Sequence, residues 1–164
     1  MNKAQAFGRP GSRWRAAVAV AAMVAIMGSL LISSPAGALP PPVVLNANQL
    51  AAKRALNNDR RNYHLSYLTS RADAQAKAQA WANQLARDGY LHHSKLTAGI
   101  QGHWCSLAEN VGMSTAGIAD VEARFMASPV HRKNILTARF NSVGIGYATG
   151  GGAVWIVQVF VKTC

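Results

Sequence analysis

The sequence predicts an α+β protein built as a three-layer α-β-α sandwich. Apolar residues recur at helical spacing in the middle of the chain, whereas the C-terminal part is rich in β-forming residues. The segment 153–161 (AVWIVQVFV) is apolar on both faces, so both faces of its sheet should be covered. Helices packed on each side of a small sheet meet that requirement.

The first 38 residues have the composition of a secretory signal peptide. Four basic residues precede an uncharged apolar run, 16–32, and the small-residue site Ala36-Gly37-Ala38 follows it. We expect cleavage before Leu39. The alternative is a retained membrane anchor, since the run is at the lower limit for spanning a bilayer. Residues 39–45 are then a linker, and a single domain occupies 46–164.

The predicted mature chain is basic. Cleavage removes four of the seventeen basic residues and none of the six acidic ones, which leaves a net charge of +7. Such a secreted or cell-envelope protein is attracted to anionic lipid headgroups or wall polymers, although the charge can also serve only solubility. The basic residues are not interleaved with aromatic ones, so we do not expect nucleic-acid binding. We expect no transmembrane segment after signal cleavage.

The elements follow from local patterns. A first helix is expected at 46–63, where residues recur at helical spacing: Leu50, Arg54, Asn57 and Arg61. The capping-box pattern of 70–73 predicts the start of a second helix that ends at Gly89. Residues 90–117 are expected to be irregular. A third helix at 118–127 ends at Ser128-Pro129.

The C-terminal region and the two cysteines add further constraints. A short helical turn is expected at 131–136, and strands at 142–148 and 153–161 flank a TGGG hairpin signal. Cys105 and Cys164 are the only cysteines, and an exported chain with two thiols most simply pairs them. The alternative, Cys105 as a nucleophile, needs a free thiolate and a nearby base.

Three short segments carry residues suited to chemistry. GYLHHS (89–94) contains His93, LAEN (107–110) contains Glu109, and SPVHRKNIL (128–136) contains His131. Glu109 is one of two glutamates in the chain and lies among small and apolar residues, where an uncompensated charge is costly. Imidazole and carboxylate groups are ligands that zinc accepts, but the spacing alone does not show that they converge.

The order of these segments resembles the bacterial branch of the CAP superfamily, also called SCP. SPVHRKNIL is similar to the bacterial pattern SPGHR.NIL, AEN is similar to GEN, and RFNSVGIGYA and AVWIVQVF follow in the expected order. The resemblance covers about 45–160. It implies an α-β-α sandwich with a cavity that holds two histidines and two acids, a tetrad that binds divalent metal in several members.

By motif position, the resemblance assigns His93, Glu109 and His131 to this tetrad and to a metal, most simply zinc with a water as the fourth ligand. The fourth tetrad position is open. Many relatives have an acid three residues after the helix aromatic, whereas here Ser128 follows Phe125. Glu122, one turn earlier, either reaches the cavity or is a solvated helix residue; the second interpretation is favoured.

The resemblance implies a secreted, non-catalytic module that binds a lipid, a sterol or an anionic envelope ligand. One alternative is a metal-dependent hydrolase, because a metal lowers the pKa of bound water. The sequence shows no separate general base and no oxyanion arrangement, which favours binding over catalysis. A further alternative is a structural envelope protein in which the tetrad residues only support the fold.

Overall fold

The computed structural model describes residues 42–164, so the predicted signal peptide lies outside the described residues. The elements in chain order are α1 (Ala47–Asn62), β1 (Thr69–Ser70), α2 (Ala72–Asp88), β2 (Trp104–Ser114), α3 (Ile118–Ala127), α4 (Pro129–Ile135), β3 (Ser142–Gly150) and β4 (Ala153–Thr163). Within 42–164, no helix combines the length and the apolar character needed to cross a membrane.

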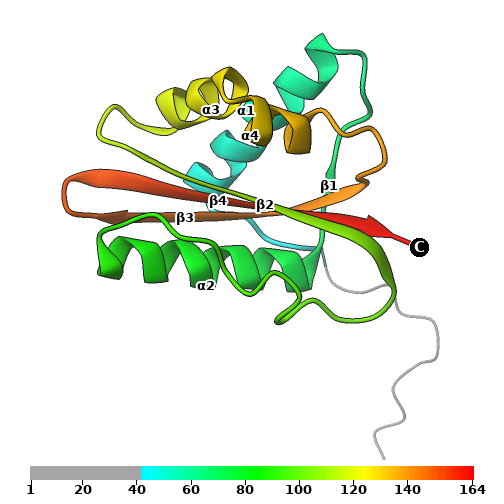
Figure 1. Cartoon of the computed structure of the whole chain (residues 1–164), viewed down its shortest axis with the longest axis horizontal. Helices are drawn as coiled ribbons and strands as arrows, with labels where there is room; N and C mark the ends of the chain where they lie inside the picture. The colour runs from blue at the N-terminus through cyan, green and yellow to red at the C-terminus, as the bar shows by residue number, and fades with distance from the viewer. Residues whose placement is uncertain (1–41) are drawn as a thin grey trace, which may run out of the picture. The chain divides into compact units, whose positions relative to one another are not determined.

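A four-stranded sheet forms the middle layer, in the order β1-β3-β4-β2. β4 pairs antiparallel with both β2 and β3, and the two-residue β1 pairs parallel with β3. Helix α2 covers one face, whereas α1, α3 and α4 cover the other (Figure 1). The predicted α-β-α sandwich is confirmed, and β4 is buried on both faces, as its apolar sequence requires.

Glycines on β3 allow α2 to lie directly on the sheet. A Cβ atom at Gly144 would lie 2.0 Å from the Ala74 carbonyl oxygen, and one at Gly146 would lie 2.0 Å from that of Ala78. Any larger residue at these positions would push the helix away from the sheet. The β3–β4 hairpin turns at Gly151 and Gly152, both with positive φ, which is the conformation that a two-residue turn between twisted strands requires.

Helix α1 is amphipathic, but the stripe that it buries differs from the expected one. Its N-terminus is capped by Asn46, and the buried residues are Gln49, Ala52, Leu56 and Arg60. Leu50, part of the expected stripe, is exposed. Arg60 has no exposed surface. Its guanidinium donates hydrogen bonds to the backbone carbonyls of Ser66, Ile135 and Thr137, which compensate for the loss of water. Backbone acceptors from later segments therefore allow a charged residue inside the α1 layer.

Two local predictions were wrong. Residues 104–114, expected to be irregular, form the eleven-residue strand β2. The capping box at 70–73 is absent, since Ser70 belongs to β1 and its hydroxyl accepts a hydrogen bond from Lys53. Helix α2 instead begins after Arg71, which has no side-chain capping bond. In both places contacts with distant segments override the local signal.

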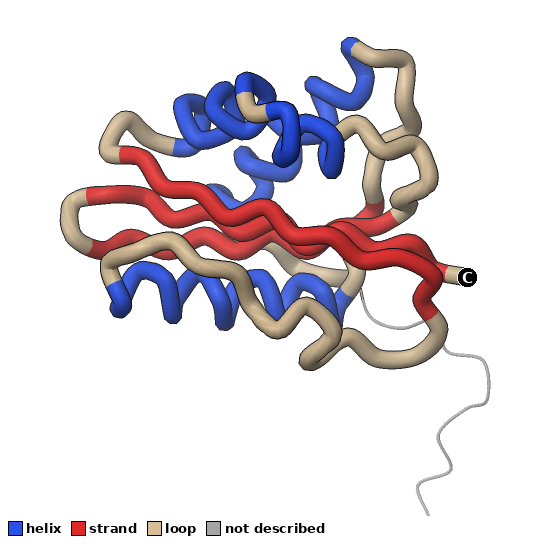
Figure 2. The backbone as a smooth tube through the Cα atoms, in the orientation of Figure 1, coloured by secondary structure: helices blue, strands red, loops and turns tan. Residues whose placement is uncertain are grey.

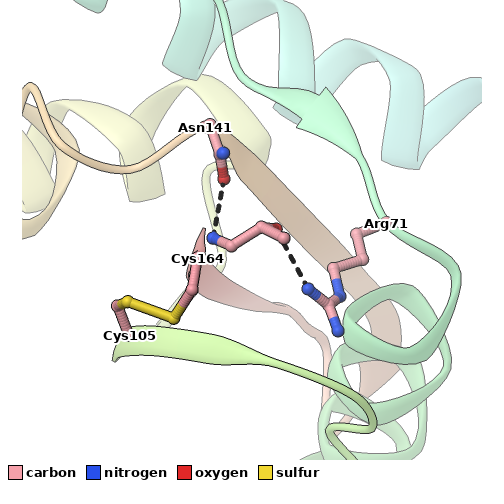
Figure 3. Close-up of a disulfide and its surroundings, with 5 residues drawn as sticks. Arg71, Cys105, Asn141 and Cys164 are labelled. Carbon is pink, nitrogen blue, oxygen red and sulfur yellow. Dashed lines mark hydrogen bonds between the residues drawn. A yellow bond between two sulfur atoms is a disulfide. The ribbon is translucent and has the colours of Figure 1, made fainter.

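The predicted disulfide is confirmed. Cys105 and Cys164 are bonded, with Cα atoms 5.4 Å apart, and join the start of β2 to the C-terminus just after β4 (Figure 3). The same end of β4 is held from the other side. Asn141 accepts a hydrogen bond from the Thr163 amide at 3.1 Å, and Arg71 donates one to the Thr163 hydroxyl at 3.1 Å. The cysteine pair therefore belongs to the scaffold, which leaves no free thiol for nucleophilic chemistry in 42–164.

Candidate functional site

The Glu109 carboxylate is buried, and both of its oxygens accept hydrogen bonds. Its Oε1 accepts hydrogen bonds from His93 Nδ1 and from the Ser94 amide, both at 2.9 Å, and its Oε2 accepts one from the Ser94 hydroxyl at 2.6 Å. The Glu109 side chain is 3% exposed and that of His93 is 60% exposed. A carboxylate can only accept, so the hydrogen bond to Glu109 uses the Nδ1 proton of His93 and leaves its Nε2 for another partner.

The side chains of Glu109 and Asn110 point to opposite faces of the sheet, because successive residues of a strand alternate. Asn110 lies opposite Gln158 of β4, and its side chain faces the helix layer of α3 and α4. Asn110 Nδ2 donates to the His131 carbonyl oxygen at 3.2 Å and to Gln158 Oε1 at 3.0 Å, while its Oδ1 accepts from Asn134 Nδ2 at 2.8 Å. This amide cluster fixes α4 against β2 and so positions the backbone that carries His131.

His131 lies close enough to His93 for their charges to interact. Burial lowers the pKa of His131 below its ordinary value of 6.5, and the charge of His93 lowers it further. The His131 ring also packs on Phe125, with the ring centroids 5.1 Å apart. The structure therefore brings His93, Glu109 and His131 to one edge of the sheet from three separate segments. His131 is held there as a neutral imidazole.

Glu122 is buried, which corrects the favoured expectation of a solvated residue. It is 5% exposed, and its Oε2 accepts a hydrogen bond from Gln158 Nε2 at 2.7 Å. Burial raises the pKa of Glu122 to about 8, and the charge of Asp59 on α1 adds to this effect. With its pKa near 8, Glu122 is the protonated member of this pair of carboxyl groups at neutral pH. Glu122 thus contacts Gln158 and Asp59 rather than Glu109 or His93.

A zinc site needs nitrogen, sulfur or carboxylate ligands that converge in tetrahedral geometry. In the part of the chain that the structure describes, no three histidine, cysteine or acidic side chains are grouped closely enough to hold a metal ion. Both Glu109 oxygens are occupied by hydrogen bonds from His93 and Ser94. The arrangement does not fit a zinc site with His93, Glu109 and His131 all as direct ligands. It leaves two imidazoles, one of them oriented by a carboxylate.

A cavity of about 360 Å³ lies beside His131. It opens between β2, α3 and the loop after α2, and is lined by Leu91, Val111, Gly112, Met113, Val121, Arg124, Phe125, Ser128 and His131. The lining is mostly apolar, with Arg124, Ser128 and His131 as its polar side chains. Gly112 keeps this region compact, because a Cβ atom there would lie 2.6 Å from the Phe125 ring. The volume falls in the range of small-molecule sites.

Sequence reasoning missed four residues of this region. Ser94 satisfies Glu109, Asn134 satisfies Asn110, Gln158 joins Asn110 to Glu122, and Asp59 pairs with Glu122. Gln158 offered a signal, since it is the one polar residue in the otherwise apolar segment 153–161. Ser94 and Asn134 stand in the quoted motifs without a role assigned to them. Asp59 gave no signal, because it reads as an ordinary residue of an exposed helix.

Comparison with known proteins places the chain in a family. The sequence model of the CAP family, described as the cysteine-rich secretory protein family, matches residues 53–160. The chain belongs to this family, as its motifs predicted. No curated protein matches the sequence.

Several solved structures share the fold. An outer surface protein of Borrelia burgdorferi is 13% identical with a TM-score of 0.63, and the match covers 77% of this chain and 100% of that one. An extracellular SCP-domain protein of Bacillus anthracis is 19% identical with a TM-score of 0.61, and the match covers 76% of this chain and 45% of that one. Venom allergen-like protein 4 of Schistosoma mansoni is 16% identical with a TM-score of 0.58, over 73% and 91% of the two chains. At these levels of sequence identity, the similarity shows a shared fold and nothing more.

Proposed function

We propose that this protein is a secreted, non-catalytic binding protein for a lipid-like molecule with an apolar body and an anionic end group. The observation that carries the proposal is the cavity beside His131, which combines apolar walls with a cation. Leu91 and Met113 offer accessible apolar surface to the body of the ligand, and the buried Val121 and Phe125 lie behind it. Two of the structurally similar proteins are described as outer-surface or extracellular proteins, which supports the proposed location.

Arg124 and His131 supply the polar recognition in this proposal. Arg124 Nε donates to Asp120 Oδ2 at 2.6 Å, and its side chain is 69% exposed, so its remaining N–H groups are available to a carboxylate or phosphate. His131 is kept neutral at pH 7 and can donate one hydrogen bond to the same group. Catalysis is not part of this proposal, because the described residues around the cavity show no activated nucleophile.

A fatty-acid probe tests the proposal. Laurate binding is measured by calorimetry and by the rise in melting temperature, for the wild type and for Leu91→Asp, Arg124→Gln and His131→Ala. Leu91→Asp should weaken binding at least tenfold, since it places a charge at the apolar mouth. Val44→Asp is the matched control, because Val44 is an exposed apolar residue outside the cavity lining. Equal affinity in all variants, or no binding by the wild type, contradicts the proposal.

As a second candidate, we propose that zinc binds between His93 and His131. The Glu109–His93 hydrogen bond favours this candidate, because a carboxylate on one ring nitrogen orients the other nitrogen toward a metal. Glu109 then acts by positioning His93 rather than as a ligand. Zinc titration by calorimetry, with His93→Ala/His131→Ala as the control, tests it. Zinc binding that survives this double substitution contradicts the site, and a metal-dependent hydrolase is worth assaying only if the substitution removes the binding.

A further inference from the structure

A second groove lies between α2 and the loop that leads from α2 to β2. Figure 2 shows this loop running alongside α2. The volume of the groove is about 610 Å³, larger than that of the cavity beside His131. One wall is a stripe of α2, formed by Asp73, Lys77, Gln84 and Arg87 at helical spacing. The opposite wall comes from the loop, through Ser94, Lys95, Ala98 and Gly99.

The charges of the groove are mostly positive and unpaired. Lys77, Arg87 and Lys95 line it, and none of the three takes part in an ion pair among residues 42–164. The one acidic lining residue, Asp73, is neutralised by Arg71, with Nε and Oδ1 2.7 Å apart. Lys77 and Arg87 stand ten residues apart on α2, which corresponds to about 15 Å. The cationic groups therefore span the length of the groove rather than one point.

The position of the loop wall is fixed by hydrogen bonds. Lys77 Nζ donates to the Lys95 carbonyl oxygen at 2.9 Å, and Trp81 Nε1 donates to the His92 carbonyl oxygen at 3.0 Å. Ser94 is held by Glu109 on its other side. Because Ser94 lines the groove and bonds Glu109, the groove adjoins the buried carboxylate. The groove is thus a formed feature with anchored walls.

The surface chemistry fits a sugar chain better than a simple polyanion. Trp81 and the exposed methyl groups of Ala76 and Ala80 give an apolar floor on which the C–H faces of sugar rings can pack. The Ser94 hydroxyl donates its proton to Glu109, and the Gln84 amide bonds Asp88 and Arg87, so both oxygens keep a lone pair that can accept from a sugar hydroxyl. We propose that this groove binds a linear acidic polysaccharide, with its carboxylates on Arg87 and Lys95 and its rings over Trp81 and Ala80. This site is independent of the cavity beside His131.

Binding of polygalacturonate, measured by calorimetry at several salt concentrations, tests the proposal. Arg87→Gln/Lys95→Gln should weaken binding about tenfold and flatten its salt dependence. Arg61→Gln/Lys133→Gln is the matched control, because it removes the same charge from exposed residues of α1 and α4, across the sheet from α2. Equal weakening by both pairs means that binding follows net charge alone, and it overturns the proposal.

A second pair of variants tests the floor of the groove without altering the core. Ala80 is exposed on α2, so Ala80→Glu and Ala80→Gln should fold normally. Ala80→Glu should abolish polygalacturonate binding, since it adds bulk and an opposing charge, and Ala80→Gln should weaken it less. Polyphosphate bound as tightly as polygalacturonate, with the same loss in the Arg87→Gln/Lys95→Gln variant, contradicts a sugar-specific groove. His131→Ala should leave polygalacturonate binding unchanged, which separates this proposal from the lipid cavity.

Discussion

Replacing Glu122 by glutamine should remove a pH-dependent loss of stability. The folded-state pKa of Glu122 is raised from the ordinary 4.5 to about 8, because the side chain is buried beside Asp59. The folded state therefore holds a proton that the unfolded chain releases above pH 4.5. The contribution of Glu122 to stability is therefore fully present below pH 4.5 and is lost as the pH rises toward 8. The whole difference corresponds to about 5 kcal/mol, of which about 3 kcal/mol is already lost at pH 7.

Glutamine reproduces the contacts without the titration. Its Oε1 can accept from Gln158 Nε2, as the Glu122 carboxyl group does, and its amide places no charge beside Asp59. Glu122→Gln should therefore match the wild type near pH 4 and exceed its free energy of unfolding by about 3 kcal/mol at pH 7.

Urea unfolding from pH 4 to pH 9 measures this difference between the two proteins, which cancels the titration of every group that does not interact with Glu122. Asp120→Asn, on the same helix, is the control with the opposite sign. Hydrogen bonds from Ser114 and Arg124 hold the pKa of Asp120 below its ordinary value, so its removal should destabilise the protein at neutral pH. Parallel curves for the wild type and Glu122→Gln would show that Glu122 ionises freely in the folded protein, and would refute the reasoning.

Three further predictions concern the scaffold and His131. Gly146→Ala should lower the free energy of unfolding by about 3 kcal/mol, because the new Cβ atom would lie 2.0 Å from the Ala78 carbonyl oxygen; an unchanged urea midpoint contradicts this packing. Cys105→Ser/Cys164→Ser should cost up to about 4 kcal/mol by chain entropy, since the bridge joins residues 59 positions apart. The test is thermal melting, in which an unaltered midpoint is the contrary result. His131 should titrate below 6.5 by NMR, and its contribution to stability should be lost as the pH falls through that lowered pKa; a midpoint above 6.5 would place it in an exposed or acid-paired environment.

Local patterns predicted those parts of the fold that depend on neighbours in the chain. The β3–β4 hairpin follows from two glycines between apolar strands, and α2 ends at Gly89 with the positive φ that the sequence suggests. Local patterns did not predict the elements whose structure depends on contacts with distant segments. β2 contains the adjacent polar pair Glu109 and Asn110, which hides its strand character. The pair is tolerated because each side chain finds partners from other segments, on opposite faces of the sheet.

The sequence by itself determined the family, the sandwich and the disulfide. These features depend on ordered motifs and on residue types that admit few alternatives. Only the tertiary structure decided that Glu109 holds His93 and Ser94, and that Glu122 is buried against Asp59 and Gln158. The physical reason is that the cost of burying a carboxyl group depends on which hydrogen-bond partners the fold brings to it, and sequence spacing does not encode those partners.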